Sequence, residues 1–299
     1  MSSKRIVIIG GVAGGMSAAT RLRRLDEQAE IIVVERSGHV SFANCGLPYH
    51  VGGVIAQRDS LLLQTPASLG ARFGLDVRVR QEAVAIDAAG RSVQVRNLAT
   101  GEVYDLEYDA LILSPGATPV RPPLPGIERA LTLRNVEDTD AIIAACADAT
   151  TAVVVGGGFI GIELAENLVH RGLQVTLVEA TPQVMAPIDP ELAAVVHDRL
   201  RDNGVDLRLG QSVAAIGADD VTLADGTRVA ADVVVAAIGV RPDTSLAVGA
   251  GLAPADVDYL LGRGLGISNL VRRSTARADE LTAAELRDGV ARVEALVAE

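Results

Sequence analysis

Short apolar runs alternate with segments of helical periodicity along most of the chain. The run that follows Arg5 is apolar up to Gly10 and leads into a glycine-rich turn, after which residues 16–25 have the spacing of a helix. A second apolar run over 30–35 ends in an acidic residue. Continuous apolar strands of this kind are typical of parallel sheets that are buried on both faces. The pattern therefore predicts a βαβ unit at the start of the chain.

The same order of elements returns in the second half of the chain. We expect an apolar strand at 151–155, a glycine-rich turn at 156–161, a helix that ends near His170 and a strand at 174–179. Both units have the strand, turn and helix order of a Rossmann-like module. We therefore predict an α/β fold that contains two such three-layer modules.

Between the two modules, the pattern changes to strict alternation. Residues 75–80, 92–96 and 103–108 alternate apolar and polar positions, as antiparallel strands with one solvated face do. These segments predict a three-stranded β-meander. The chain then returns through an apolar strand at 110–113, and the proline-rich segment 118–125 indicates a crossover between domains.

Composition and charge exclude several function classes. The 299 residues are enough for two domains, and they include 27 Lys and Arg against 38 Asp and Glu, with no Trp. The net charge of −11 repels nucleic acid and anionic membranes, and the few aromatic residues leave little for base stacking. No apolar run approaches the roughly 20 residues that span a bilayer, and the first strand leaves no room for a signal peptide. We expect a cytoplasmic protein with neither a nucleic-acid nor a membrane partner.

The second glycine-rich turn predicts a nicotinamide dinucleotide site. Gly156, Gly158 and Gly161 match the G-x-G-x-x-G pattern in full, and Glu179 follows 18 residues later at the end of the next strand. Such a turn presents backbone N–H groups to a pyrophosphate, and the acid binds the ribose 2′-hydroxyl. A carboxylate repels a 2′-phosphate, and the next two residues supply no arginine, so NADH is favoured over NADPH. The alternative is a turn that serves only close backbone packing.

The first glycine-rich turn departs from this pattern in one place. Gly10 and Gly15 occupy the outer positions, but Val12 occupies the middle one, and Glu35 follows Gly15 by 20 residues. Two dinucleotide sites in one chain are most simply explained by electron transfer between a flavin and a nicotinamide.

The two cysteines are too few for a disulfide framework. Cys45 lies in a polar segment near a predicted helix N-terminus, where reactive thiols occur, although a small buried side chain is the alternative. Cys146 follows an apolar helical stretch and is expected to be buried. We predict no metal site.

Six segments carry a resemblance to a known family. They are residues 10–15, 41–49, 111–117, 133–140, 153–163 and 237–242. The sequence SFANCGLPY around Cys45 is the most specific of them. Together they resemble the single-cysteine branch of the FAD-dependent pyridine nucleotide–disulfide oxidoreductases, which includes coenzyme A-disulfide reductase, NADH oxidase and NADH peroxidase. The similarity covers residues 4 to about 252, and Val12 is usual for this branch.

The resemblance implies roles for individual residues. Cys45, beside Asn44, would be the redox-active nucleophile, and Glu163 would be the acid near the nicotinamide and the flavin. The cofactor ligands would be Gly10, Val12, Ala13, Gly14, Gly15, Glu35, Arg36, Ser114 and Gly116 for FAD, with Gly156, Gly158, Gly161, Glu179 and Gly239 in the second half. The coenzyme A ligands would be Ser17, Arg21, Arg24, Ser41 and Asn44, the arginines being suited to phosphates.

One departure from the family bears on the reaction. Oxidases and peroxidases of this branch carry a histidine in the first loop, where this chain has Ala13. This difference favours disulfide reduction, because a thiol leaving group needs less proton assistance. His39 is either a substitute acid or simply a solvated side chain.

The resemblance also implies the domain limits. The FAD-binding domain would be 1–117 with about 241–278, the NAD(H)-binding domain 118–240, and an atypical amphipathic helix 279–299 would end the chain. Relatives are homodimers that continue with a closing strand, a Gly-Asp segment and a dimerisation domain, none of which is recognisable after residue 253. We expect an incomplete FAD-binding domain.

Three hypotheses follow. The first is a reductase that passes hydride from NADH through FAD to Cys45 and on to coenzyme A disulfide or a persulfide, with NADH oxidase activity as a variant. The second is an NAD(H)-binding protein without turnover. The third is an interaction module that uses the helix at 279–299.

Overall fold

The computed structural model describes residues 3–252 and 265–266. Their contacts divide the chain into two compact units. The first unit takes its described residues from Met1–Ser41, Gln64–Gly116 and Asp243–Glu299, and the second is built from Phe42–Leu63 and Ala117–Pro242. The predicted helix at 279–299 lies outside the described residues.

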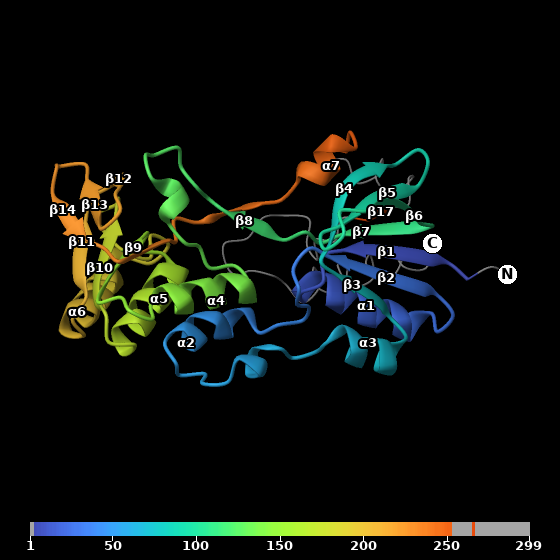
Figure 1. Cartoon of the computed structure of the whole chain (residues 1–299), viewed down its shortest axis with the longest axis horizontal. Coiled ribbons are helices and arrows are strands. Elements are labelled where there is room, and N and C mark those ends of the chain that lie inside the picture. Colours follow the sequence, from blue (N-terminus) through green and yellow to red (C-terminus); the bar gives the residue numbers. More distant parts are fainter. Residues whose placement is uncertain (1–2, 253–264, 267–299) are drawn as a thin grey trace. The chain divides into compact units, whose positions relative to one another are not determined.

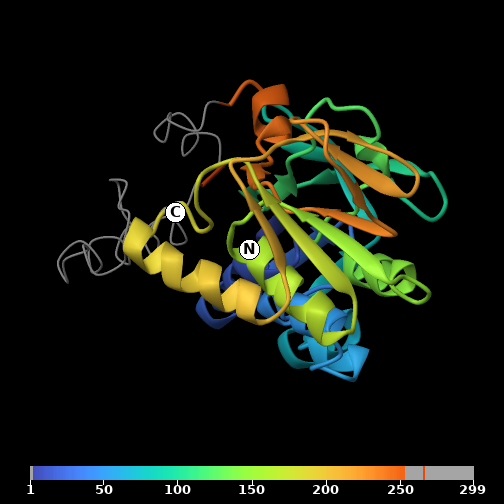
Figure 2. The same ribbon diagram turned by 90° about the vertical axis from the view of Figure 1, so that its left-hand side faces the viewer.

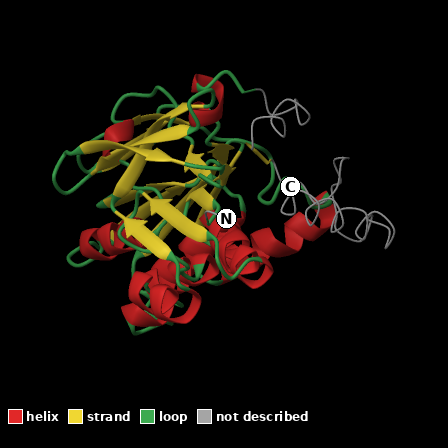
Figure 3. Cartoon of the chain, turned by 90° about the vertical axis from the view of Figure 1, so that its right-hand side faces the viewer, coloured by secondary structure: helices red, strands yellow, loops and turns green. Residues whose placement is uncertain are grey.

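The first unit is built on a parallel sheet (Figure 1). The strand order is β17 (Leu265–Gly266), β7 (Ala110–Leu113), β1 (Arg5–Ile9), β2 (Glu30–Glu35) and β3 (Asp76–Val79). Helices α1 (Ala13–Leu25) and α3 (Pro66–Phe73) pack on one face, and the short helix α7 spans Ser245–Gly249. Residues of α7 pack on the opposite face, and Figure 3 shows the chain's helices and strands coloured separately.

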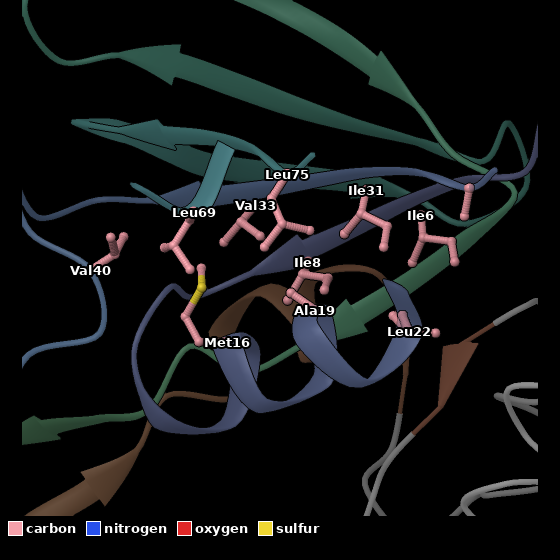
Figure 4. Close-up of a cluster of buried hydrophobic side chains, with 11 residues drawn as sticks. Ile6, Ile8, Met16, Ala19, Leu22, Ile31, Val33, Val40, Leu69 and Leu75 are labelled. Carbon is pink, nitrogen blue, oxygen red and sulfur yellow. The ribbon is translucent and has the colours of Figure 1, made fainter. Parts of the chain in front are cut away.

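Alternate side chains of β1 and β2 face opposite sides of this sheet. Ile8 and Ile31 face α1, and Figure 4 shows them in one cluster with Met16 and Ala19 of that helix. Their neighbours along the strands, such as Val7, face the opposite cluster. Both faces are buried, which explains why Ile6–Ile9 of β1 and Ile31–Val34 of β2 are all apolar.

The other face is covered by an antiparallel sheet of β4 (Gln81–Asp87), β5 (Ser92–Asn97) and β6 (Val103–Glu107). A meander was expected, but its first strand was assigned wrongly. Residues 76–79 form β3, which pairs in parallel with β2, and the meander begins instead at Gln81. The cause is that β3 lies at the edge of the parallel sheet, so its half-exposed positions alternate like those of an antiparallel strand.

The second unit repeats the parallel arrangement. Its sheet has the order β11 (Asp206–Leu209), β10 (Gln174–Glu179), β9 (Thr151–Val155) and β15 (Val233–Ala236). Its helices are α2 (Leu47–Val51), α4 (Val136–Ala145), α5 (Phe159–His170) and α6 (Pro190–Asp202). Figure 2 faces this unit and shows α6 beside the strands of the sheet.

Two smaller sheets complete the second unit. One is antiparallel and contains β12 (Val213–Ile216), β13 (Asp220–Leu223) and β14 (Arg228–Ala230). The other pairs β8 (Ala117–Pro119) with β16 (Val240–Pro242). Both βαβ units and the three-layer α/β fold class are confirmed, although α1 begins at Ala13, three residues before the predicted start.

Two observations differ from the sequence analysis. Residues 42–63 were expected in the first domain, whereas their contacts place them in the second unit, because α2 packs against α4 and α5. No closing strand was expected after residue 253, yet Leu265–Gly266 pairs in parallel with β7. That strand is only two residues long, too short to give a recognisable pattern in the sequence.

Candidate functional site

The first glycine loop joins β1 to α1 and is shaped by close backbone contacts. Gly10 has φ +99°, and a Cβ there would overlap the carbonyl oxygen of Ser114 at the end of β7. A Cβ at Gly15 would overlap the carbonyl oxygen of Gly10. Both positions therefore require glycine for packing, whatever binds at the loop.

The carboxylate of Glu35 is held against this loop. Its Oε2 accepts the backbone N–H of Gly11 (2.7 Å), and its Oε1 accepts that of Ser37 (2.7 Å). A carboxylate has about four acceptor positions, so two remain for the hydroxyls of a ribose. Arg36 is exposed and reaches Glu82 of β4 at 3.7 Å.

The second glycine loop joins β9 to α5 with the same construction. Gly156 has φ +107°, and its Cβ would lie 2.5 Å from the carbonyl oxygen of Ala237. A Cβ at Gly161 would overlap the carbonyl oxygen of Gly156. Gly158 differs, because it is exposed and no atom of the described residues lies within 4 Å of the place a Cβ would take. Of the three glycines in the pattern, only Gly158 has open space where its side chain would be.

Glu179 repeats the role of Glu35. Its Oε2 accepts the N–H of Gly157 (2.7 Å), and its Oε1 accepts both the N–H and the hydroxyl of Thr181 (2.8 Å each). The sequence analysis missed Thr181 and Ser37 as residues that orient these acids. Their shared position, two residues after the acid, is the signal that could have revealed them.

Both loops end at helix N-termini that no side chain caps. In the described part of the chain, α1 and α5 receive no side-chain hydrogen bond at the N-cap and carry no acid in the first turn. By contrast, α3 is capped by Thr65 and α4 by Asn135. Uncapped N–H groups and the positive end of the helix dipole suit an anion such as pyrophosphate.

The other predicted cofactor positions surround these loops. Val12 is the half-buried N-cap of α1, whereas Ala13 and Gly14 are exposed. The carbonyl of Gly116 accepts the N–H of Asp243 at 2.9 Å. That of Gly239 accepts the N–H of Val120 at 3.0 Å.

Cys45 is exposed in a 3-10 turn, Asn44–Gly46, that leads directly into α2. A bridge between Phe42 and Leu62 ties down the start of this segment. Asn44 is exposed next to the thiol. Cys146 is buried, as expected, and burial raises the pKa of its thiol. Of the two thiols, only that of Cys45 is open to a substrate.

Glu163 lies on α5, in the same unit as Cys45. Its backbone carbonyl accepts Nδ2 of Asn167 at 2.7 Å. Asn167 is buried and lies so close to Gly52 that a Cβ there would overlap its side chain. Arg171, at the end of α5, donates from Nη1 to the carbonyl of Val51 at 2.8 Å. These contacts fasten α2, which follows the cysteine, to the helix that carries Glu163.

The predicted coenzyme A ligands lie in two places. Ser17, Arg21 and Arg24 are exposed on α1, at spacings that put them on one face of the helix. Ser41 belongs to the first unit, with φ +47° and its N–H on the carbonyl of Gly11 (2.9 Å), whereas Asn44 belongs to the second. His39 is half-buried, and its backbone N–H donates to Oγ of Ser37 at 3.0 Å.

Neither a metal cluster nor a membrane helix is found in residues 3–252 and 265–266. No three His, Cys, Asp or Glu side chains are grouped there to hold an ion. No helix in this range is long and apolar enough to cross a bilayer.

Residues 4–259 match the family model described as pyridine nucleotide-disulphide oxidoreductase. The chain belongs to this family. The family predicted from the sequence motifs is thereby confirmed, and membership supports FAD and NADH as the two dinucleotides.

Several relatives resemble the chain over most of its length. The coenzyme A disulfide reductase of Staphylococcus haemolyticus is 34% identical over 259 residues, which are 86% of this chain and 59% of that protein. The crystal structure of reduced Bacillus anthracis CoADR-RHD is 42% identical with a TM-score of 0.88, covering 100% of this chain and 57% of the other. An NAD-dependent persulfide reductase from A. fulgidus is 36% identical with a TM-score of 0.80, covering 85% and 48%. The chain thus spans about half the length of these relatives.

Proposed function

We propose that this chain carries the dinucleotide-binding part and the reactive thiol of an NADH-dependent reductase of small disulfides or persulfides. One observation supports this most strongly. The two loops share one construction, in which a carboxylate is hydrogen-bonded to a loop glycine beside an uncapped helix, and the same chain exposes a single thiol. Its relatives include a coenzyme A disulfide reductase and a persulfide reductase.

The first unit would hold FAD. The N–H groups at the start of α1 would bind the pyrophosphate, and the free acceptor positions of Glu35 would bind the ribose. The exposure of Ala13 and Gly14 at this helix start fits such a ligand, because their backbone is open to it. FAD bound here supplies two-electron transfer between a nicotinamide and a sulfur atom.

The second unit would hold NADH. The N–H groups at the start of α5 would bind its pyrophosphate across the open space at Gly158. One ribose hydroxyl would bind the remaining acceptor position of Glu179, whose negative charge disfavours the 2′-phosphate of NADPH. Glu163, four residues into the same helix, would lie on the nicotinamide side, and its half-buried carboxylate would hold or release a proton there.

Cys45 would carry out the sulfur chemistry. Its thiolate attacks one sulfur of the substrate disulfide, the S–S bond breaks, and the other half leaves as a thiolate. This step leaves a mixed disulfide between Cys45 and the retained half. Release of that half requires two electrons and a proton, and NADH is their source. Asn44 is exposed beside the thiol and would hold the substrate by hydrogen bonds.

We propose a coenzyme A-based substrate. Arg21 and Arg24 lie on one exposed face of α1 together with Ser17. Guanidinium groups bind phosphates through paired N–H donors, and coenzyme A carries three phosphates. The alternative of an NADH oxidase is disfavoured by Ala13, because the first loop then has no acid for oxygen chemistry.

An NAD(H)-binding protein without turnover is the second candidate, because the second glycine loop alone offers a complete site. A visible spectrum of the purified chain separates the two. Bound flavin that NADH bleaches without oxygen supports the reductase, whereas a colourless protein that binds NADH supports the second candidate.

A Cys45→Ser variant tests the thiol directly, with Cys146→Ser as the matched control. We expect the first variant to lose turnover of coenzyme A disulfide and the second to keep it. Turnover retained by Cys45→Ser would refute the thiol mechanism even with flavin bound.

A further inference from the structure

The second unit contains a cavity that neither glycine loop contributes to. Its volume is about 410 Å³, and it opens where α2, α4 and α5 lie side by side (Figure 1). The side chains that characterise it are His50, Ile55, Arg58, Asp140, Ile143 and Arg171. Its size lies at the lower end of the range for small-molecule sites, roughly 300–1,000 Å³.

One of the two arginines in the cavity is neutralised. Arg58 forms a two-pronged ion pair with Asp140, with Nε 2.8 Å from Oδ1 and Nη2 2.6 Å from Oδ2. This pair contributes no net charge to the cavity. It forms a wall that joins the 3-10 turn Arg58–Leu61 to the middle of α4.

Arg171 keeps most of its hydrogen-bonding capacity. One of its five guanidinium N–H groups donates to the carbonyl of Val51 at 2.8 Å, and the other four have no acceptor among the described residues. A half-buried guanidinium with open donors is a strong site for a carboxylate, which matches its planar fork. Arg171 therefore gives the cavity a positive charge that no acid of its lining neutralises.

His50 adds an acceptor of hydrogen bonds. Its ring Nδ1 lies 2.6 Å from the carbonyl of Ile55, and since a carbonyl only accepts, the proton is on Nδ1. In the neutral ring Nε2 is then an acceptor, and it has no partner among the described residues. A ligand here gains from a hydroxyl that donates to Nε2.

The remaining wall is apolar. Ile55 and Ile143 are half-buried at the cavity, and the small side chains Ala56 and Ala144 leave room beside them. Together these groups offer a cationic fork, one acceptor and a short apolar surface.

We propose that this cavity binds a small monocarboxylate that also carries a hydroxyl group. The carboxylate pairs with Arg171, the hydroxyl donates to Nε2 of His50, and the short carbon chain packs on the two isoleucines. None of these residues belongs to the dinucleotide loops, and the site does not depend on the proposed reductase function.

The test uses methyl NMR of the full chain labelled at isoleucine δ1. Titration with L-lactate is expected to shift the methyl signals of Ile55 and Ile143 in a saturable way, while Ile8 in the first unit stays unchanged. Propionate, which lacks the hydroxyl, is expected to bind at least fivefold more weakly. No saturable shift with lactate, or saturation by inorganic phosphate alone, would overturn the proposal.

Two variants locate the site. Ala144→Trp fills the cavity and is expected to raise the Kd for lactate at least tenfold, whereas Ala141→Trp, an exposed position of α4 outside the cavity, is expected to leave it unchanged. Arg171→Lys keeps the charge but removes the fork, and is expected to raise the Kd for lactate about as much as Ala144→Trp does. It serves as the test of the site if Ala144→Trp fails to fold. Equal affinity in the parent, Ala144→Trp and Arg171→Lys would place the binding elsewhere and refute this assignment.

Discussion

Two glycines of the second loop are expected to affect different properties, Gly158 the binding of NADH and Gly161 the stability of the fold. Gly158 has φ −76° and ψ −176°, an extended conformation that alanine adopts without strain, and no described atom lies within 4 Å of the added methyl. We therefore expect Gly158→Ala to change the free energy of unfolding by less than about 1 kcal/mol. Gly161→Ala is its matched counterpart in the same loop.

The effect of Gly158→Ala on NADH binding is expected to be large, in contrast to its small effect on stability. The methyl of Gly158→Ala occupies the open mouth of the loop and keeps the pyrophosphate from one or two backbone N–H groups. Each hydrogen bond to a charged group contributes about 1.5–3 kcal/mol. The loss of a single bond raises the Kd for NADH roughly 10- to 150-fold.

Gly161→Ala acts on the fold instead. Its methyl would overlap the carbonyl oxygen of Gly156, and because both groups belong to the backbone no side-chain rotation relieves the clash. Overpacking of this kind costs about 1–3 kcal/mol. For a chain of this size, the Tm should fall by roughly 2–4 °C for each kcal/mol lost.

Thermal melts and NADH titrations of both variants test this reasoning. The expected result is an unchanged Tm with weak NADH binding for Gly158→Ala, and a clearly lowered Tm for Gly161→Ala. The reasoning is refuted if Gly158→Ala binds NADH as tightly as the parent, or if the two variants lose equal stability.

Three further predictions follow from single residues. Iodoacetamide should alkylate Cys45 in the folded chain and Cys146 only after unfolding, and mass spectrometry of peptides checks this; equal rates would contradict the burial. Glu179→Gln should shift the ratio of NADPH to NADH affinity toward NADPH at least about tenfold, because the carboxylate no longer repels the 2′-phosphate; an unchanged ratio would show that the acid does not face the ribose. Four hydrogen bonds from residues 150–151 lower the pKa of Asp232 to about 2, so its contribution to stability is present above about pH 4 and is lost as the pH falls toward 2. In Asp232→Asn, the free energy of unfolding measured by urea melts should fall less between pH 4 and pH 2 than in the parent. An unchanged dependence on pH would show that Asp232 does not cause this loss of stability.

The sequence predicts most reliably the strands that are buried on both faces. Strands β1 and β9 are covered on both faces, so every position after the first residue of each strand is apolar and the pattern is unambiguous. Strand β3 lies at a sheet edge, where half-exposed positions imitate an antiparallel strand, and its partner could not be predicted.

The surroundings of the site were less predictable. Glycine spacing located both loops, because only glycine fits where a Cβ would meet a backbone carbonyl. The attachment of α2 to α5 through Asn167 and Arg171 depends on contacts more than 100 residues apart in the chain, and no local pattern encodes them. The same is true of the cavity beside them.

The two acids, Glu35 and Glu179, have a consequence for affinity. Both carboxylates are fixed by backbone N–H groups of the chain itself. Immobilising a flexible side chain on association costs about 0.5–1.5 kcal/mol, and here that entropy is lost during folding rather than during binding. On the proposed function, the loops would hold both acids ready for a nucleotide, and a substitution of Ser37 or Thr181 that frees the carboxylate would weaken binding without removing a nucleotide contact.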